Sequence, residues 1–115
     1  MGRKYSVELT SQAQEQIFQI AQYVLKKFHD PDAADQIVDR LETAILSLDR
    51  MPERVPLADM EPWHSRGVHK FIVGHYIVYF IILEAELLVR VTAVVLGRMD
   101  QKIQLDQMKL LEKQE

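Results

Sequence analysis

The sequence predicts an α+β domain with the element order β-α-α-β-β-β, in which a helical hairpin packs on a small, curved, antiparallel sheet. Residues 66–100 contain three consecutive strand-like segments separated by short turns, and residues 10–49 contain two amphipathic helical segments joined by few residues. Strands joined so closely must pair antiparallel, because a parallel crossover needs a dozen or more residues. Each helix has one apolar stripe, and the sheet is the surface available to cover both stripes.

A short strand is expected first, because apolar and polar residues alternate over residues 4–9. Thr10 or Ser11 then caps a helix, and Gln14 stands three residues after Ser11 as a weak capping box. The periodic apolar positions of this helix continue to a predicted end near His29.

The second helix begins at Asp30-Pro31, since aspartate caps helices well and proline is tolerated at the first helical position. Its apolar positions continue to a predicted end near Asp49. Two long helices with so short a connection must lie antiparallel. Their apolar stripes are Ala13, Ile17, Ile20, Ala21, Val24 and Phe28 in the first helix and Ala34, Ile37, Val38, Leu41, Ala44, Ile45 and Leu48 in the second.

An irregular connector is expected over residues 51–66, which have three prolines and no periodicity. Trp63 within it is expected to cover one edge of the core. A loop that contacts a substrate is the other interpretation of this segment, and the sequence does not separate the two.

The three strands are expected at residues 68–73, 76–83 and 87–96, with a polar turn at 84–86. The middle segment is a nearly unbroken apolar run of strand length, which is typical of a central strand buried on both faces. Residues 1–100 are therefore expected to form one domain. The tail, residues 101–115, is expected to form a short helix or to become ordered on a partner.

Composition excludes several classes of function. The chain has 115 residues and no cysteine, so disulfides, thiolate catalysis and cysteine-ligated zinc are excluded. Its longest apolar run is far shorter than the roughly 20 residues needed to cross a bilayer, and the start has no secretory leader pattern. We expect a cytoplasmic protein without a membrane association or a cofactor.

The formal net charge is −3, so attraction to nucleic acid is not a property of the whole molecule. Positive charge is concentrated toward the sheet, since residues 61–102 contain five Lys and Arg, four Asp and Glu, and three histidines. A thin basic patch on the sheet is therefore possible, while the helical half is acidic.

This order of elements resembles the RelE/ParE superfamily of bacterial toxins from type II toxin–antitoxin systems, also known as plasmid stabilisation proteins. The resemblance covers roughly residues 4–100 and is specific for the superfamily through the order and spacing of its parts. The matching stretches are Tyr5-Ser6-Val7-Glu8-Leu9-Thr10 with Ala13, Ile20-Ala21-Gln22-Tyr23-Val24, Pro31 with Ala33-Ala34, Leu48 before Pro52, Arg66-Gly67, Phe71-Ile72-Val73-Gly74-His75-Tyr76-Ile77-Val78-Tyr79, and Leu96-Gly97-Arg98-Met99-Asp100.

The RelE-like branch of this superfamily implies a ribosome-dependent mRNA endonuclease, or mRNA interferase. Such cleavage needs a base for the 2′-hydroxyl, positive charge at the phosphate and an acid for the leaving oxygen. The nucleases of this branch usually have an arginine three residues before the tyrosine that corresponds to Tyr79, and this chain has Tyr76 at that position. They also usually have lysines on the preceding strand, where this chain has Gly67 and His69. The residues left for such a site are Arg66, His69, Lys70, Tyr76 and Arg98.

The ParE-like branch implies an inhibitor of DNA gyrase without a nuclease site. The strand Val73-Gly74-His75-Tyr76-Ile77-Val78-Tyr79 and the ending Leu96-Gly97-Arg98-Met99-Asp100 are closer to this branch. The acidic composition disfavours binding to the polyanionic ribosome. We therefore predict a ParE-like toxin whose sheet presents its far side to a macromolecule, with Arg66, Lys70 and Arg98 as target-binding candidates. An antitoxin-binding relative that is not toxic is a third hypothesis.

The same residues have purely structural interpretations. Tyr76 and Tyr79 suit a strand as sheet aromatics, and His69 and His75 suit a solvated strand position. His69 is also a possible acid or base, because its ordinary pKa is near neutral. No metal site is expected, since no third ligand accompanies the two histidines.

The resemblance also implies a cognate antitoxin that wraps around the toxin. The toxin is expected to form a homodimer or a hetero-oligomer with this antitoxin. Its contact residues are predicted to be exposed apolar side chains, because such surface is costly to leave in water. The candidates are Phe18 and Leu25 on the outer face of the first helix and Met108 and Leu111 in the tail.

Overall fold

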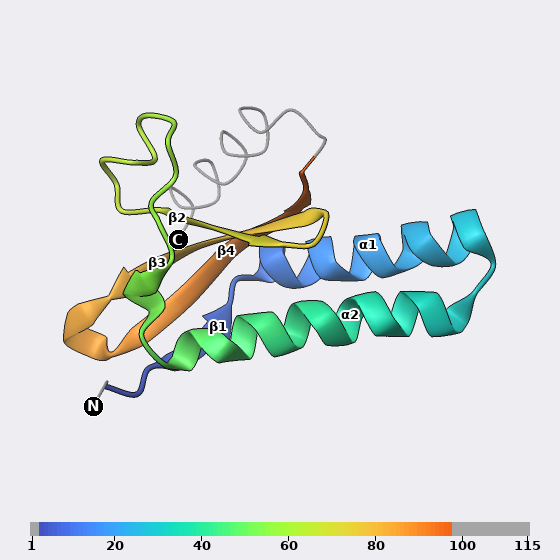
Figure 1. The fold of residues 1–115 in the computed structure, drawn as a ribbon, viewed down its shortest axis with the longest axis horizontal. Coiled ribbons are helices and arrows are strands. Elements are labelled where there is room, and N and C mark those ends of the chain that lie inside the picture. The colour runs from blue at the N-terminus through green and yellow to red at the C-terminus, as the bar shows by residue number, and fades with distance from the viewer. Residues whose placement is uncertain (1–2, 98–115) are drawn as a thin grey trace.

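The computed structural model describes residues 3–97 and contains two helices on one face of a four-stranded sheet (Figure 1). The order of elements is the predicted one, β-α-α-β-β-β. The strands are β1 (Ser6–Leu9), β2 (His69–Val73), β3 (Tyr76–Leu83) and β4 (Leu88–Leu96), and the helices are α1 (Ser11–Phe28) and α2 (Pro31–Leu46). The predicted tail with Met108 and Leu111 lies outside the described residues, and so does Arg98.

The sheet has the order β1-β4-β3-β2 and is mixed, which corrects the prediction of a wholly antiparallel sheet. Strands β2, β3 and β4 pair antiparallel, as their short connections require. Strand β1 instead pairs parallel with β4, from Ser6 opposite Leu88 to Leu9 opposite Val91. Most of the chain lies between these two strands, so the connection is long enough for a parallel pair.

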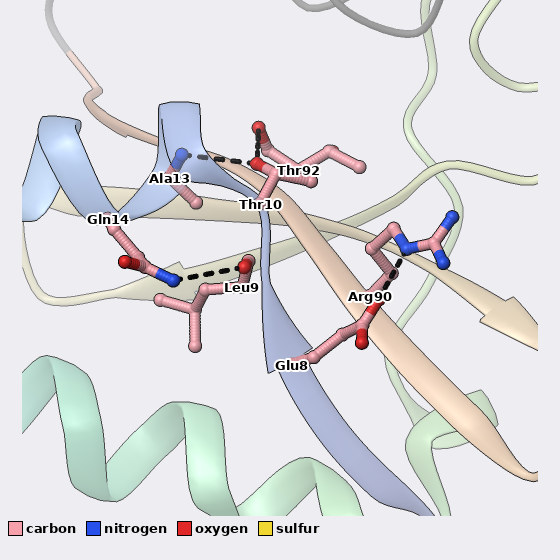
Figure 2. Close-up of polar contacts among 7 residues, drawn as sticks. All are labelled: Glu8, Leu9, Thr10, Ala13, Gln14, Arg90 and Thr92. Carbon is pink, nitrogen blue, oxygen red and sulfur yellow. Dashed lines mark hydrogen bonds and ion pairs between the residues drawn. The ribbon is translucent and has the colours of Figure 1, made fainter. Parts of the chain in front are cut away.

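Both helices begin at side-chain caps. The Thr10 hydroxyl accepts a hydrogen bond from the Ala13 amide at 3.2 Å, which identifies Thr10 as the cap of α1 (Figure 2). The Gln14 side chain donates to the Leu9 carbonyl rather than completing a capping box at Ser11. At α2, the Asp30 carboxylate precedes Pro31 and accepts hydrogen bonds from the backbone amides of Asp32 and Ala33, so Asp30 is the cap, as predicted.

The helix α1 covers the edge of β4 where β1 stops. The Thr10 hydroxyl donates to the Thr92 carbonyl at 3.3 Å (Figure 2), and the side-chain oxygen of Gln16 accepts from the Val94 amide at 2.7 Å. Thr92 is the extra residue of a bulge, because Tyr79 of β3 lies opposite Ala93 while Phe80 lies opposite Val91. The side chains of Thr10 and Gln16 thus bind backbone groups of β4 that a longer β1 would otherwise have paired with.

Hydrophobic clusters lie on both faces of the sheet. Val78 and Phe80 of β3 belong to the cluster under the helices, whereas Ile77 and Tyr79 belong to a second cluster that contains Trp63. Strand β3 is therefore a central strand buried on both faces, as predicted. Trp63 is 1% exposed, so the connector covers much of the far face that the sequence interpretation assigned to a macromolecular target.

Short turns complete the fold. Residues Glu84–Glu86 form a 3₁₀ helix at the predicted polar turn. Gly74 has φ +61° at the first position of the two-residue turn between β2 and β3, a conformation that glycine adopts without strain. In residues 3–97, neither helix has the length and apolarity that crossing a bilayer requires.

Candidate functional site

A groove of about 290 Å³ lies between the two helices and the hairpin end of β2 and β3. The helices extend past the hairpin turn between β2 and β3 (Figure 1). The groove is lined by Tyr23, Val24, Lys27, Phe28, Ile37, Arg40, Leu41, Val73, His75, Tyr76 and Leu96.

The floor of the groove is apolar and buried. Val24 of α1 is 2% exposed and Leu41 of α2 is 1% exposed. By contrast, Tyr23 and Phe28 at its border are exposed by 55% and 59%. The helical hairpin therefore presents aromatic side chains to water directly beside a closed apolar floor.

The border of the groove is cationic. The Lys27 ammonium lies 5.5 Å from the centre of the Tyr23 ring and 5.6 Å from that of Phe28, and it donates to the Tyr23 hydroxyl at 3.3 Å. Arg40 approaches the hairpin turn, where a Cβ at Gly74 would lie 3.6 Å from its Nη1. None of the described residues that line the groove is acidic.

Of the described candidate nuclease residues, Tyr76 is the one that lines this groove. Burial raises its pKa above the ordinary value of 10.0, and the nearby Tyr23 raises it further. A phenol with a raised pKa keeps its proton at neutral pH, so Tyr76 is not prepared to act as a base.

Arg66, His69 and Lys70 lie at the other end of β2. The guanidinium of Arg66 stacks 5.7 Å from the centre of the Trp63 ring, in the turn before the strand. His69 and Lys70 are neighbours in the strand, so their side chains point to opposite faces of the sheet.

His69 has a structural role in the described chain. Its ring stacks on Phe80 with centroids 4.9 Å apart, and its Nδ1 donates to the Val55 carbonyl at 2.6 Å. The expectation of a solvated strand histidine is therefore wrong, since both the ring face and one nitrogen have partners. His75 lies in the turn after β2, not on the same strand face.

The described candidate nuclease residues are not gathered at one place. His69 opposes Phe80 and Val73 opposes Tyr76, so His69 and Tyr76 lie at opposite ends of the hairpin, about 13 Å apart along the strand. Arg98 lies outside the described residues. Phe18 and Leu25 are exposed by 57% and 37%, but neither lines the groove.

The sequence interpretation missed the groove. Tyr23 and Phe28 were attributed to the family pattern and to the apolar stripe that faces the sheet. No local pattern in the sequence marks the groove, because it depends on where the helices lie relative to the hairpin turn. Within residues 3–97, no three histidines or carboxylates come together as metal ligands.

Comparison with known proteins identifies the family. Residues 7–101 match the model of the ParE toxin of the type II toxin–antitoxin system parDE. The chain has no match among curated protein sequences.

Two solved structures share the fold. The chromosomal ParDE toxin–antitoxin system from P. aeruginosa superposes with a TM-score of 0.67 at 14% identity, covering 81% of this chain and 96% of the other. The toxin–antitoxin complex RelBE2 from Mycobacterium tuberculosis superposes with a TM-score of 0.58 at 20% identity, covering 82% of this chain and 92% of the other. With the family match over most of its length and the fold in common, the chain belongs to the ParE toxin family of type II toxin–antitoxin systems.

Proposed function

We propose that this ParE-family toxin inhibits DNA gyrase in the cytoplasm and that a cognate antitoxin neutralises it. The observation that supports this most directly is the separation of the candidate nuclease residues. RNA cleavage by positioned acid and base groups requires them within hydrogen-bond reach of one phosphodiester. His69 and Tyr76 lie at opposite ends of the hairpin, and His69 is engaged by Val55 and Phe80.

The charge of the molecule supports the same proposal. The formal net charge is −3 and the sequence pI is about 5.8. A protein that binds the ribosome approaches a large polyanion, and such binding depends on Lys and Arg that neutralise phosphates. Binding to a protein target such as gyrase does not require Lys and Arg that neutralise phosphates.

Both solved structures that share the fold come from toxin–antitoxin systems, which supports an antitoxin as the partner of this chain. In such a pair the antitoxin must bind the folded toxin. A surface of exposed apolar side chains, such as the border of the groove, is suited to that contact.

Induction of the toxin alone tests the proposed target. DNA synthesis and protein synthesis are followed separately after induction, and purified toxin is added to a gyrase supercoiling assay and to a translation extract. We expect DNA synthesis to stop first, supercoiling to be inhibited and translation to continue. Ribosome-dependent mRNA cleavage in the extract would establish the RelE-like alternative instead.

A pair of variants sharpens this test. His69→Ala and Arg66→Ala should each abolish the effect of a nuclease that uses these residues. For a gyrase inhibitor, the two variants should keep growth inhibition as long as circular dichroism shows them folded. Normal growth with the wild-type toxin, in the absence of antitoxin, would favour a relative that only binds antitoxin.

A further inference from the structure

The outer face of α1 presents two large apolar side chains to water. Phe18 and Leu25 are exposed by 57% and 37%. They are seven residues apart, which is about two helical turns, so they lie on one face of the helix. The buried side of α1, which contains Ala13 and Val24, faces the core instead. Apolar side chains grouped on one exposed face indicate a surface for a protein partner.

The charges at the two ends of this face identify the partner. Glu15, one turn before Phe18, is the acidic residue of α1, and Lys26 directly follows Leu25. Both charged side chains are exposed, and neither forms an ion pair with another residue of the range 3–97. The face therefore has a negative end, an apolar middle and a positive end. Such a face is complementary to a copy of itself that runs in the opposite direction.

An antiparallel pair of α1 helices brings these groups together. In a twofold-symmetric contact, Phe18 of each copy packs on Leu25 of the other copy. Glu15 then lies within about 3 Å, measured along the helix axis, of the level of Lys26 in the other copy, because each residue of a helix advances about 1.5 Å. Two equivalent ion pairs thus flank the apolar contacts.

The centre of the same face suits a close helix pair. Ala21 and Gln22 lie midway between Phe18 and Leu25, so the twofold axis passes beside them. The small side chain of Ala21 allows the two helix axes to approach closely. Gln22 is exposed, and its amide group can exchange hydrogen bonds with Gln22 of the other copy. A polar residue at the centre of a helix pair favours the register in which it meets a polar partner.

We infer that the outer face of α1 is the interface of a toxin homodimer, with Phe18 and Leu25 as its apolar contacts and Glu15 and Lys26 as its ion-pair partners. This dimer goes beyond the proposed function, because it is independent of the toxin's target. It gives to a second copy the face that the sequence interpretation gave to the antitoxin. An interface with two apolar contacts per copy is small, so we expect a dissociation constant on the order of 10–100 μM.

Two phenylalanines of α1 provide a matched test. Phe18 lies on the outer face and Phe28 lines the groove, while their exposed fractions are 57% and 59%. The full chain is made by cell-free synthesis, and its association is measured by sedimentation equilibrium over a range of concentrations. We expect Phe18→Gln to raise the dissociation constant about tenfold or more, because a symmetric dimer loses the contact twice. Phe28→Gln should leave the constant within about twofold of the wild type.

Reversal of the two charges tests the antiparallel arrangement. Glu15→Lys places two cations at each ion pair, and Lys26→Glu places two carboxylates there. Each single variant should therefore weaken association several-fold at low salt, because attraction becomes repulsion. The double variant with both changes in one chain has opposite charges again and should associate like the wild type. Circular dichroism checks that all variants are folded.

The outcomes separate the possible occupants of this face. A toxin that stays monomeric at concentrations up to about 1 mM rules out the dimer. A dimer that Phe18→Gln and the single charge variants leave intact uses another surface, and loss of the dimer in Phe28→Gln alone would place the interface in the groove. A double charge variant that stays weak would contradict the antiparallel arrangement. If Phe18→Gln keeps self-association but weakens binding to the protein encoded beside the toxin gene, the face belongs to the antitoxin.

Discussion

Gln16 shows how one side chain can complete a sheet edge. Strand β1 pairs with β4 only as far as Val91, and beyond it the Val94 amide donates to the Gln16 side-chain oxygen at 2.7 Å. A buried amide without a partner costs free energy comparable to a lost hydrogen bond. Because β1 is short, α1 must present a polar side chain to the Val94 amide, and Gln16 does so.

Replacing Gln16 tests this role. Gln16→Ala should lower the free energy of unfolding by about 1 kcal/mol, because the Val94 amide loses its acceptor. The measurement is urea denaturation followed by circular dichroism. Gln19→Ala is the matched control, since Gln19 is exposed and its side chain donates to Glu15 of the same helix. Equal losses in the two variants would contradict an edge-specific role.

At the scale of an element, the connector between α2 and β2 is a structural layer rather than a loose loop. Its Ala58 amide donates to the Val68 carbonyl, and the Lys70 amide donates to the Pro56 carbonyl, so the connector runs along the edge of β2. Trp63 anchors it in the second hydrophobic cluster. The sheet thus has a cover on each face, helices on one and connector on the other.

Removing the anchor should release the connector. Trp63→Ala creates a cavity at a position that is 1% exposed, and the expected loss is about 3–5 kcal/mol of unfolding free energy. We expect a lower melting temperature together with faster tryptic cleavage after Arg54 and Arg66. Trp63→Phe, which keeps most of the apolar volume, should lose less. Cleavage at the wild-type rate in Trp63→Ala would show that the connector is held by its backbone contacts instead.

At the scale of the whole molecule, the sequence predicted the elements better than their assembly. Local patterns identified the helical hairpin, the three consecutive strands and the Asp30 cap, because periodicity and capping are properties of neighbouring residues. The parallel partner of β1 could not be predicted, since the pairing joins residues far apart in the chain, such as Glu8 and Arg90, which are 82 residues apart. The groove was missed for the same reason, as it depends on how the helices lie relative to the turn between β2 and β3.

Alkaline pH should destabilise the folded molecule through its tyrosines. The pKa of Tyr5 is raised by its hydrogen bond to the Glu84 carboxylate, and burial raises the pKa values of Tyr76 and Tyr79. A raised pKa means that the folded state holds the proton more tightly than the unfolded state. The resulting stability is fully present below the ordinary pKa of 10.0 and is lost as the pH rises through the folded-state values.

Urea denaturation at a series of pH values tests this expectation. The unfolding free energy of the wild type should fall as the pH rises above about 10. Tyr79→Phe should show a shallower fall, because its buried ring no longer has an ionisable hydroxyl. A slope identical to that of the wild type would mean that Tyr79 does not contribute.

The parallel pairing of β1 with β4 has a consequence for synthesis of the toxin. Ser6 leaves the ribosome long before its partner Leu88, so the sheet cannot be completed on a nascent chain that lacks β4. A message truncated upstream of β4 would yield a polypeptide without a finished fold. The folded domain therefore forms only after β4 has been synthesised.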